Sequence, residues 1–287
     1  MSIRSNPGQS ENVSSAAYGL AFCVLGRAES VLMARGAGFD FVVADMEHGP
    51  IGLGELGQMA AAGIAAGLPV YGRVTGPDSS DIARVLDCGA TGVIVPHVDS
   101  AADAQRIAQA CRFGPRGARA LPGPLPMLDY RVVPASELVD GAERNVEVIA
   151  MIESAPALDA ADQIAATPGI DMLMIGTNDL ADGIGLRGQI DHPDLRAAFQ
   201  RIAGAAAAHG CGFGVMGLPE ALVESHALAL GARAIVATNE TNLITEGGAA
   251  PVSSTTWPDG SVDHVFTNGT VTVGATGVIT YVPEPNF

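Results

Sequence analysis

Six acidic or basic side chains lie just past short apolar segments that are typical of β-strands. If parallel strands close into a barrel, their carboxyl ends open onto one mouth, so side chains far apart in the sequence converge on one polar site. Such a site could combine acid–base catalysis with the binding of an anionic substrate. The six residues are Asp45, Glu47, His48, Arg73, Glu153 and Asp179.

The segment from Phe39 to Pro50 ends in a Gly-Pro turn, and a carboxylate and an imidazole lie just before that turn. Asp45 and His48 are three residues apart, so the carboxylate could orient the imidazole as a general base. The alternative is an aspartate that caps a helix and a histidine on the surface. Arg73 ends the next apolar run and could hold a carboxylate or stabilise an enolate oxygen. It could equally form half of an internal ion pair.

Glu153 and Asp179 each follow an apolar run, and no cysteine or paired histidine lies near them in the sequence. Two carboxylates without soft ligands favour a hard, oxygen-preferring ion such as Mg²⁺ or Mn²⁺. The ion would also relieve the repulsion between two unpaired acids in one mouth. We therefore predict a divalent metal site, with a hydrogen bond from a backbone amide as the alternative for either acid alone.

Short apolar runs alternate with longer Ala- and Leu-rich segments of helical period, which indicates repeated βα units and a parallel sheet. The even spacing, and the lack of a dinucleotide-binding fingerprint in the first turn, favour an α/β fold of the (β/α)8 TIM-barrel type over a doubly wound sheet. Eight strands are expected, at Leu20–Leu25, Phe39–Ala44, Pro69–Val74, Gly92–Pro96, Val146–Ile152, Asp171–Ile175, Gly212–Met216 and Ala234–Thr238. Helices are expected at about 28–37, 53–66, 79–88, 100–111, 155–166, 194–208 and 219–230.

Three regions are expected along the chain: a polar N-terminal extension over residues 1–17, a barrel domain over 18–247 and a β-rich tail over 248–287. In the tail, Asp-Gly and Asn-Gly pairs separate β-branched runs at 262–267, 270–273 and 278–282. An Asn-Gly pair between alternating segments is a strong hairpin signal. The tail replaces the usual last helix of a barrel, and its sequence indicates no function.

The composition excludes several classes of partner. The formal net charge is −16, whereas nucleic acids and anionic membranes are bound by clustered Lys and Arg. The apolar stretches are too short and too interrupted by Gly and Pro to span a membrane, and the first residues form no signal peptide. The four cysteines form no Cys-x-x-Cys pair, which argues against structural zinc and a disulfide framework. We expect a cytoplasmic protein.

Six motifs occur in an order and spacing that together are highly specific. They are Asp45-x-Glu47-His48, the strand that ends in Arg73, Leu86-Asp87-Cys-Gly-Ala-Thr-Gly-Val-Ile-Val-Pro96, Arg112-Phe-Gly-Pro-Arg-Gly117, Ile152-Glu153-Ser154 and Ile175-Gly-Thr-Asn-Asp179-Leu. Over roughly residues 19 to 245 the chain resembles the HpcH/HpaI family of metal-dependent, class II pyruvate aldolases, in the citrate lyase beta-like superfamily.

The resemblance implies a (β/α)8 barrel in which Glu153 and Asp179 hold Mg²⁺ or Mn²⁺, or alternatively Co²⁺. Arg73 would contact the keto acid. His48, oriented by Asp45, would act as the base through a metal-bound water. Backbone amides would receive the substrate carboxylate, and two further acids would support the site. The amides are those of Gly176, Thr177, Asn178 and Asp179, and the supporting acids are Glu47 and Asp87, the latter within its own barrel or across a subunit boundary.

The implied reaction is the reversible cleavage of a 4-hydroxy-2-oxo acid to pyruvate, or a related 2-oxo acid, and an aldehyde. A citryl- or malyl-CoA-type lyase and an oxaloacetate decarboxylase are alternatives on the same site. A barrel that binds a keto acid or a metal without turnover is the alternative of another class. The chain departs from the family at Met151, where a glutamine is common, and in the Pro-rich segment 118–127. A homo-oligomer is expected.

Overall fold

The computed structural model describes residues 16–144, 146–246, 253–256, 262–266, 269–273 and 279–283, and the side chains of residues 16–144 and 146–244. The chain divides into two compact units, Met1–Asn239 and Glu240–Phe287.

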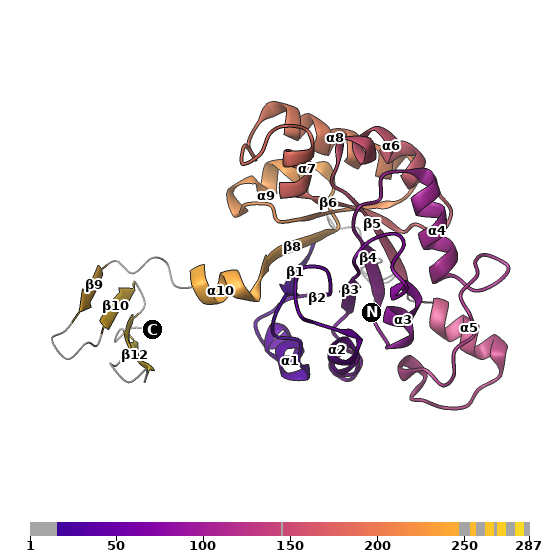
Figure 1. The fold of residues 1–287 in the computed structure, drawn as a ribbon, viewed down its shortest axis with the longest axis horizontal. Coiled ribbons are helices and arrows are strands. Elements are labelled where there is room, and N and C mark those ends of the chain that lie inside the picture. Colours follow the sequence, from indigo (N-terminus) through magenta and orange to yellow (C-terminus); the bar gives the residue numbers. More distant parts are fainter. Residues whose placement is uncertain are drawn as a thin grey trace, which may run out of the picture. The chain divides into compact units, whose positions relative to one another are not determined.

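Eight parallel strands of the first unit close into a barrel in sequence order, with β1 paired to β8 (Figure 1). This arrangement confirms the predicted (β/α)8 fold. The observed strand ends lie within a few residues of the expected ones. The strands are β1 (Ala17–Phe22), β2 (Phe41–Asp45), β3 (Val70–Arg73), β4 (Gly92–Val95), β5 (Glu147–Ile152), β6 (Met172–Gly176), β7 (Gly212–Met216) and β8 (Ala234–Asn239).

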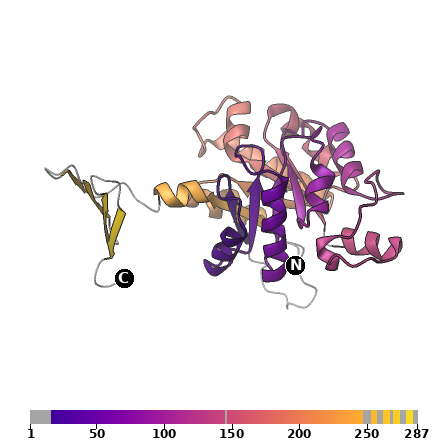
Figure 2. The ribbon, with the colours of Figure 1, turned by 60° about the horizontal axis from the view of Figure 1, so that its bottom comes forward.

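Helices surround the strands (Figure 2). The seven expected helices are present, and α5 and α7 are two that the sequence pattern did not predict. Short 3-10 turns, η1 (Pro126–Leu128) and η2 (Leu228–Leu230), precede α5 and follow α9. The helices are α1 (Ala28–Gly36), α2 (Leu53–Ala66), α3 (Ile82–Asp87), α4 (Ala101–Cys111), α5 (Ala135–Glu143), α6 (Ala155–Ala165), α7 (Thr177–Gly183), α8 (Pro193–Ala208) and α9 (Glu220–His226).

The strands bury both faces, as expected for parallel strands covered by helices. In β2, Phe41 and Val43 join a cluster that fills the inside of the barrel, whereas Val42 and Ala44 pack in the layer shared with the helices. Alternate residues of a strand point to opposite faces, which produces this division. The inside of the barrel is therefore a packed core, and chemistry is confined to its ends.

The second unit contains a short helix, α10 (Glu240–Glu246), and a four-stranded antiparallel sheet in the order β12-β11-β10-β9. The sheet confirms the prediction of a β-rich tail. The strands are β9 (Ser253–Thr256), β10 (Val262–Phe266), β11 (Gly269–Val273) and β12 (Ile279–Pro283). None of the helices within the described residues is long and apolar enough to cross a membrane.

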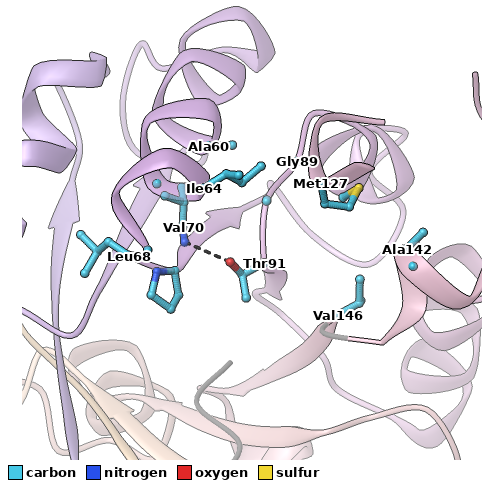
Figure 3. Close-up of a pocket in the computed structure, with 14 residues that line it drawn as sticks. Ala60, Ile64, Leu68, Val70, Gly89, Thr91, Met127, Ala142 and Val146 are labelled. Carbon is cyan, nitrogen blue, oxygen red and sulfur yellow. Dashed lines mark hydrogen bonds between the residues drawn. The ribbon is translucent and has the colours of Figure 1, made fainter. Parts of the chain in front are cut away.

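A cavity of about 210 Å³ opens beside the amino-terminal ends of β3, β4 and β5 (Figure 3). Ile64, Met127 and Val146 give it an apolar lining, and the backbone N–H of Val70 donates to the Thr91 hydroxyl at 3.2 Å. The residues that line it include no charged side chain. This end of a barrel usually serves stability.

Candidate active site

Charged residues follow four neighbouring strands at their carboxyl ends. Asp45 ends β2 and Arg73 ends β3, and the register pairs these two residues across the strands. His97 stands two residues after β4, and Glu153 directly follows β5. The parallel barrel therefore brings these side chains to one mouth.

Asp45 and Arg73 form a buried, bidentate ion pair. Arg73 donates from Nε to Oδ1 of Asp45 at 2.9 Å and from Nη2 to Oδ2 at 2.5 Å. Oδ1 also accepts the backbone N–H groups of Glu47, at 3.0 Å, and His48, at 3.2 Å. Burial alone would raise the pKa of Asp45, but the guanidinium and the two N–H groups hold that pKa below its usual value. Both partners are therefore charged, and the pair fixes the turn that carries His48.

Glu47 lies between three basic groups. Its carboxylate is 2.8 Å from Nε2 of His97, 3.4 Å from Nη1 of Arg73 and 3.7 Å from Nε2 of His48. The Glu47 side chain is 8% exposed, whereas that of His48 is 61% exposed. Asp45 thus contacts His48 through the backbone, and the imidazole itself lies beside Glu47. The sequence had suggested direct orientation of the imidazole by Asp45.

Glu153 is buried beneath His97. Its Oε1 accepts the backbone N–H of His97 at 2.6 Å and lies 3.0 Å from Nδ1 of the same residue. Burial raises the pKa of Glu153, and the nearby carboxylates of Glu47 and Asp179 raise it further, against the opposite effect of His97. The negative charge of Glu153 is therefore less well balanced by neighbouring hydrogen-bond donors and positive groups than that of Asp45.

Gly176 leaves room for the second oxygen of Glu153. A Cβ atom at Gly176 would lie 2.6 Å from Oε2 of Glu153 and 3.1 Å from Cε of Met151. Met151, at the position of the common family glutamine, belongs to the packed interior of the barrel. Oε2 of Glu153 thus lies beside a glycine and a thioether.

Helix α7 begins immediately after β6 and presents the expected substrate-binding segment. The hydroxyl of Thr177 is buried and donates to the carbonyl of Met216 in β7 at 2.7 Å, which anchors the start of the helix. Asn178 and Asp179 are exposed. Backbone N–H groups in a first helical turn lack acceptors within the helix, so they remain available to an anion.

The donor set fits a divalent ion held by few protein ligands. Among the described residues, no group of three or more His, Cys, Asp or Glu side chains is arranged to hold a metal ion. Glu153 and Asp179 interact electrostatically, and within the described chain Oε2 of Glu153 has no hydrogen-bond partner. Two carboxylates, with the remaining positions filled by water or substrate oxygens, suit Mg²⁺ or Mn²⁺.

The structure places Asp87 away from the mouth and adds His97 to the residues there. Asp87 ends α3, two residues before the cavity residue Gly89, and its carboxylate pairs with Arg119 at 2.6 Å. The structure does not bring Asp87 to the mouth of its own barrel. His97, in contrast, contacts two of the mouth acids and was missed. The rule that found the other residues, a polar side chain just past a strand, would also have found His97.

A model of the HpcH/HpaI aldolase/citrate lyase family matches residues 20–245. A 4-hydroxy-4-methyl-2-oxoglutarate aldolase from Hapsidospora irregularis is 36% identical over 221 residues, covering 76% of this chain and 82% of that protein. A hydroxypyruvate/pyruvate aldolase from Paraburkholderia phytofirmans is 34% identical over 196 residues, covering 66% and 75%. An HpcH/HpaI aldolase from Desulfitobacterium hafniense shares the fold, with a TM-score of 0.77 and 24% identity over 82% of this chain and 91% of the other.

Proposed function

The chain belongs to the HpcH/HpaI aldolase/citrate lyase family, and we propose from this premise that its barrel mouth cleaves a 4-hydroxy-2-oxo acid into pyruvate, or a related 2-oxo acid, and an aldehyde. The relatives named as aldolases support this reaction class. One observation carries the assignment to this site: the Glu47 carboxylate lies 3.4 Å from Nη1 of Arg73 and 2.8 Å from Nε2 of His97, so cationic, acidic and imidazole groups that follow separate strands form one network.

Glu153 and Asp179 would hold the divalent ion. When bound, the ion supplies Lewis-acid polarisation of the substrate's keto group. The carboxylate of the keto acid would accept N–H groups from the backbone of residues 176–179. This segment is supported by the buried Thr177 hydroxyl, so it can bind an anion without rearranging.

Arg73 would stabilise the oxygen that becomes negative as the carbon–carbon bond breaks. Its guanidinium plane is fixed by the two hydrogen bonds to Asp45, so its orientation needs no adjustment during the reaction. Nη1 points toward Glu47, at 3.4 Å. A planar donor held in this way gives directional stabilisation that a flexible ammonium group does not supply.

His48 would accept the proton of the 4-hydroxyl group. Cleavage then leaves the aldehyde and the enolate of pyruvate, and the same imidazole can return a proton to the enolate carbon. The imidazole is largely exposed, so the substrate can reach it. Glu47, beside its Nε2, can stabilise the positive charge that the imidazole gains.

The test is release of pyruvate from a 4-hydroxy-2-oxo acid that carries a hydrogen at C4 and so yields an aldehyde, followed by coupled oxidation of NADH. 4-Hydroxy-4-methyl-2-oxoglutarate, which cleaves to pyruvate alone, is assayed beside it. Chelation should abolish the activity, and Mg²⁺ or Mn²⁺ should restore it. Synthesis from pyruvate and a panel of aldehydes then defines the second product. Full activity of metal-free protein in EDTA would contradict the metal-dependent mechanism. Release of CO₂ from oxaloacetate in the absence of aldolase activity would contradict the aldol reaction.

Three finer properties belong to the same proposal. The ion is Mg²⁺ or Mn²⁺, since both donors are carboxylates. The protein works as a homo-oligomer. The protein is located in the cytoplasm: its cysteines are free thiols in the described chain, and such thiols persist in reducing compartments.

A further inference from the structure

His97 has a backbone conformation that side-chain-bearing residues rarely adopt. Its φ is 58°, in the left-handed region that favours glycine. It follows Pro96, just past the end of β4. A strained residue at a site mouth persists when specific contacts hold it there.

Three contacts account for the placement of His97. The backbone N–H and Nδ1 both approach Oε1 of Glu153, at 2.6 and 3.0 Å. Nε2 lies 2.8 Å from Oε1 of Glu47. The imidazole therefore stands between two acids whose mutual repulsion contributes to the raised pKa of Glu153.

These contacts distinguish the two oxygens of Glu153. Oε1 is occupied by two nitrogen groups of one residue, whereas Oε2 lies beside Gly176, so close that a Cβ atom on that residue would be 2.6 Å from it. A carboxylate is planar and rotates as one unit about the Cγ–Cδ bond, so contacts that hold Oε1 also fix the direction of Oε2. We propose that His97 is a positioning residue that holds Oε1 of Glu153 and thereby presents Oε2 to the divalent ion.

This inference deepens the proposed function and depends on it. His97 does not itself bind the ion here, because its two ring nitrogens face carboxylates. Groups that hydrogen-bond to a metal-binding carboxylate typically affect metal affinity about 10- to 100-fold. The same range is expected for the loss of the His97 imidazole.

The test measures Mn²⁺ binding directly, from the free Mn²⁺ signal in electron paramagnetic resonance, on the full-length protein. His97→Gly removes the imidazole and suits the left-handed backbone. His97→Asn also tolerates this backbone and keeps an amide donor. His209→Gly is the matched control, since it removes an imidazole 2.9 Å from the carboxylate of Asp162 outside the candidate site.

His97→Gly should weaken Mn²⁺ binding by roughly 10- to 100-fold, His97→Asn by less, and His209→Gly not at all. At saturating Mn²⁺ the kcat of His97→Gly should return close to the wild-type value. Equal Mn²⁺ affinity of wild type and His97→Gly overturns the inference but leaves the proposed function intact. A kcat that stays low with unchanged affinity also overturns it. Absence of Mn²⁺ binding by the wild type overturns both.

Discussion

Gly176→Ala tests whether the space above this glycine is needed by Glu153. The backbone at Gly176 has φ −84° and ψ 97°, an ordinary extended conformation, so alanine adds no backbone strain. The new methyl group would lie 2.6 Å from Oε2 of Glu153 and 3.1 Å from Cε of Met151. The Met151 thioether is flexible and can shift, whereas Glu153 is held by His97.

The size of the effect follows from this distance. A carbon and an oxygen atom rarely approach closer than about 3 Å without a hydrogen bond, so the carboxylate must move by roughly half an ångström. Catalytic and metal-binding groups must be held within about 0.5 Å of their productive positions, so this displacement reaches that limit, and a shift of 1 Å can reduce the rate about 100-fold. Gly176→Ala should therefore lower kcat/KM by roughly 10- to 100-fold and weaken Mn²⁺ binding in parallel.

The assay is a Mn²⁺ titration of pyruvate release, with thermal unfolding of the metal-free protein as the measure of fold. Gly204→Ala is the matched control, because Gly204 lies inside α8 and a Cβ atom there meets no other atom within 4 Å. That control should keep its activity and gain about 0.5–1 kcal/mol of stability. Wild-type kcat/KM and Mn²⁺ affinity in Gly176→Ala would show that Oε2 of Glu153 is not a ligand of the ion.

Three other substitutions separate the roles of the remaining groups. His48→Ala should lower kcat by roughly 10²–10⁴-fold with unchanged Mn²⁺ binding, and wild-type turnover would identify another base. Arg73→Lys should lower kcat/KM by about 10²-fold or more, because one ammonium cannot replace the planar donor; the exposed substitution Arg201→Lys is its control, and equal losses in both would contradict a specific role. Asp45→Asn should reduce the free energy of unfolding at pH 7 by on the order of 3 kcal/mol, since it leaves a buried guanidinium without its carboxylate. Because folding lowers the pKa of Asp45, the stability difference between wild type and Asp45→Asn should be complete above the ordinary pKa of 3.8 and be lost as the pH falls below it. Urea unfolding across pH 7 to 3 measures this difference. A difference that stays constant over that range would refute the prediction.

The strands of the barrel were predictable because parallel strands covered on both faces need continuous apolar runs. The bounds of β1 were not. The apolar run Leu20–Leu25 continues past the observed end at Phe22, but strand ends are set by pairing, and β1 pairs with β2 only as far as Phe22 and Ala44. Val24 and Leu25 are exposed, so hydrophobicity alone does not distinguish a paired residue from an apolar loop residue.

Two helices of the first unit escaped prediction for different reasons. α7 contains three carboxyl or amide side chains in its first six residues, and it is too short to show a helical period. α5 follows the Pro-rich segment, which reads as a loop. Its Leu138 and Ala142 instead pack with Phe113 and Leu125 in a small separate core, a tertiary contact that local sequence patterns do not reveal.

The candidate site was predictable as a set of residue types at strand ends, but its pairings were not. Sequence spacing placed Asp45 next to His48, whereas the folded chain gives the Asp45 carboxylate to Arg73, 28 positions away. A guanidinium and a carboxylate can form two parallel hydrogen bonds, and only the register of β2 with β3 reveals which carboxylate Arg73 pairs with.

The charges at the mouth explain why one acid is structural and another is a ligand candidate. Three carboxylates, those of Asp45, Glu47 and Glu153, interact with a single guanidinium, that of Arg73. Arg73 donates two hydrogen bonds to Asp45, which lower the pKa of Asp45. Glu153 has no such partner, and its pKa is raised. When environments push the pKa values of neighbouring acids apart, their roles differ. Asp45 is thus an internal counter-ion, and Glu153 is the carboxylate that a divalent cation would stabilise most.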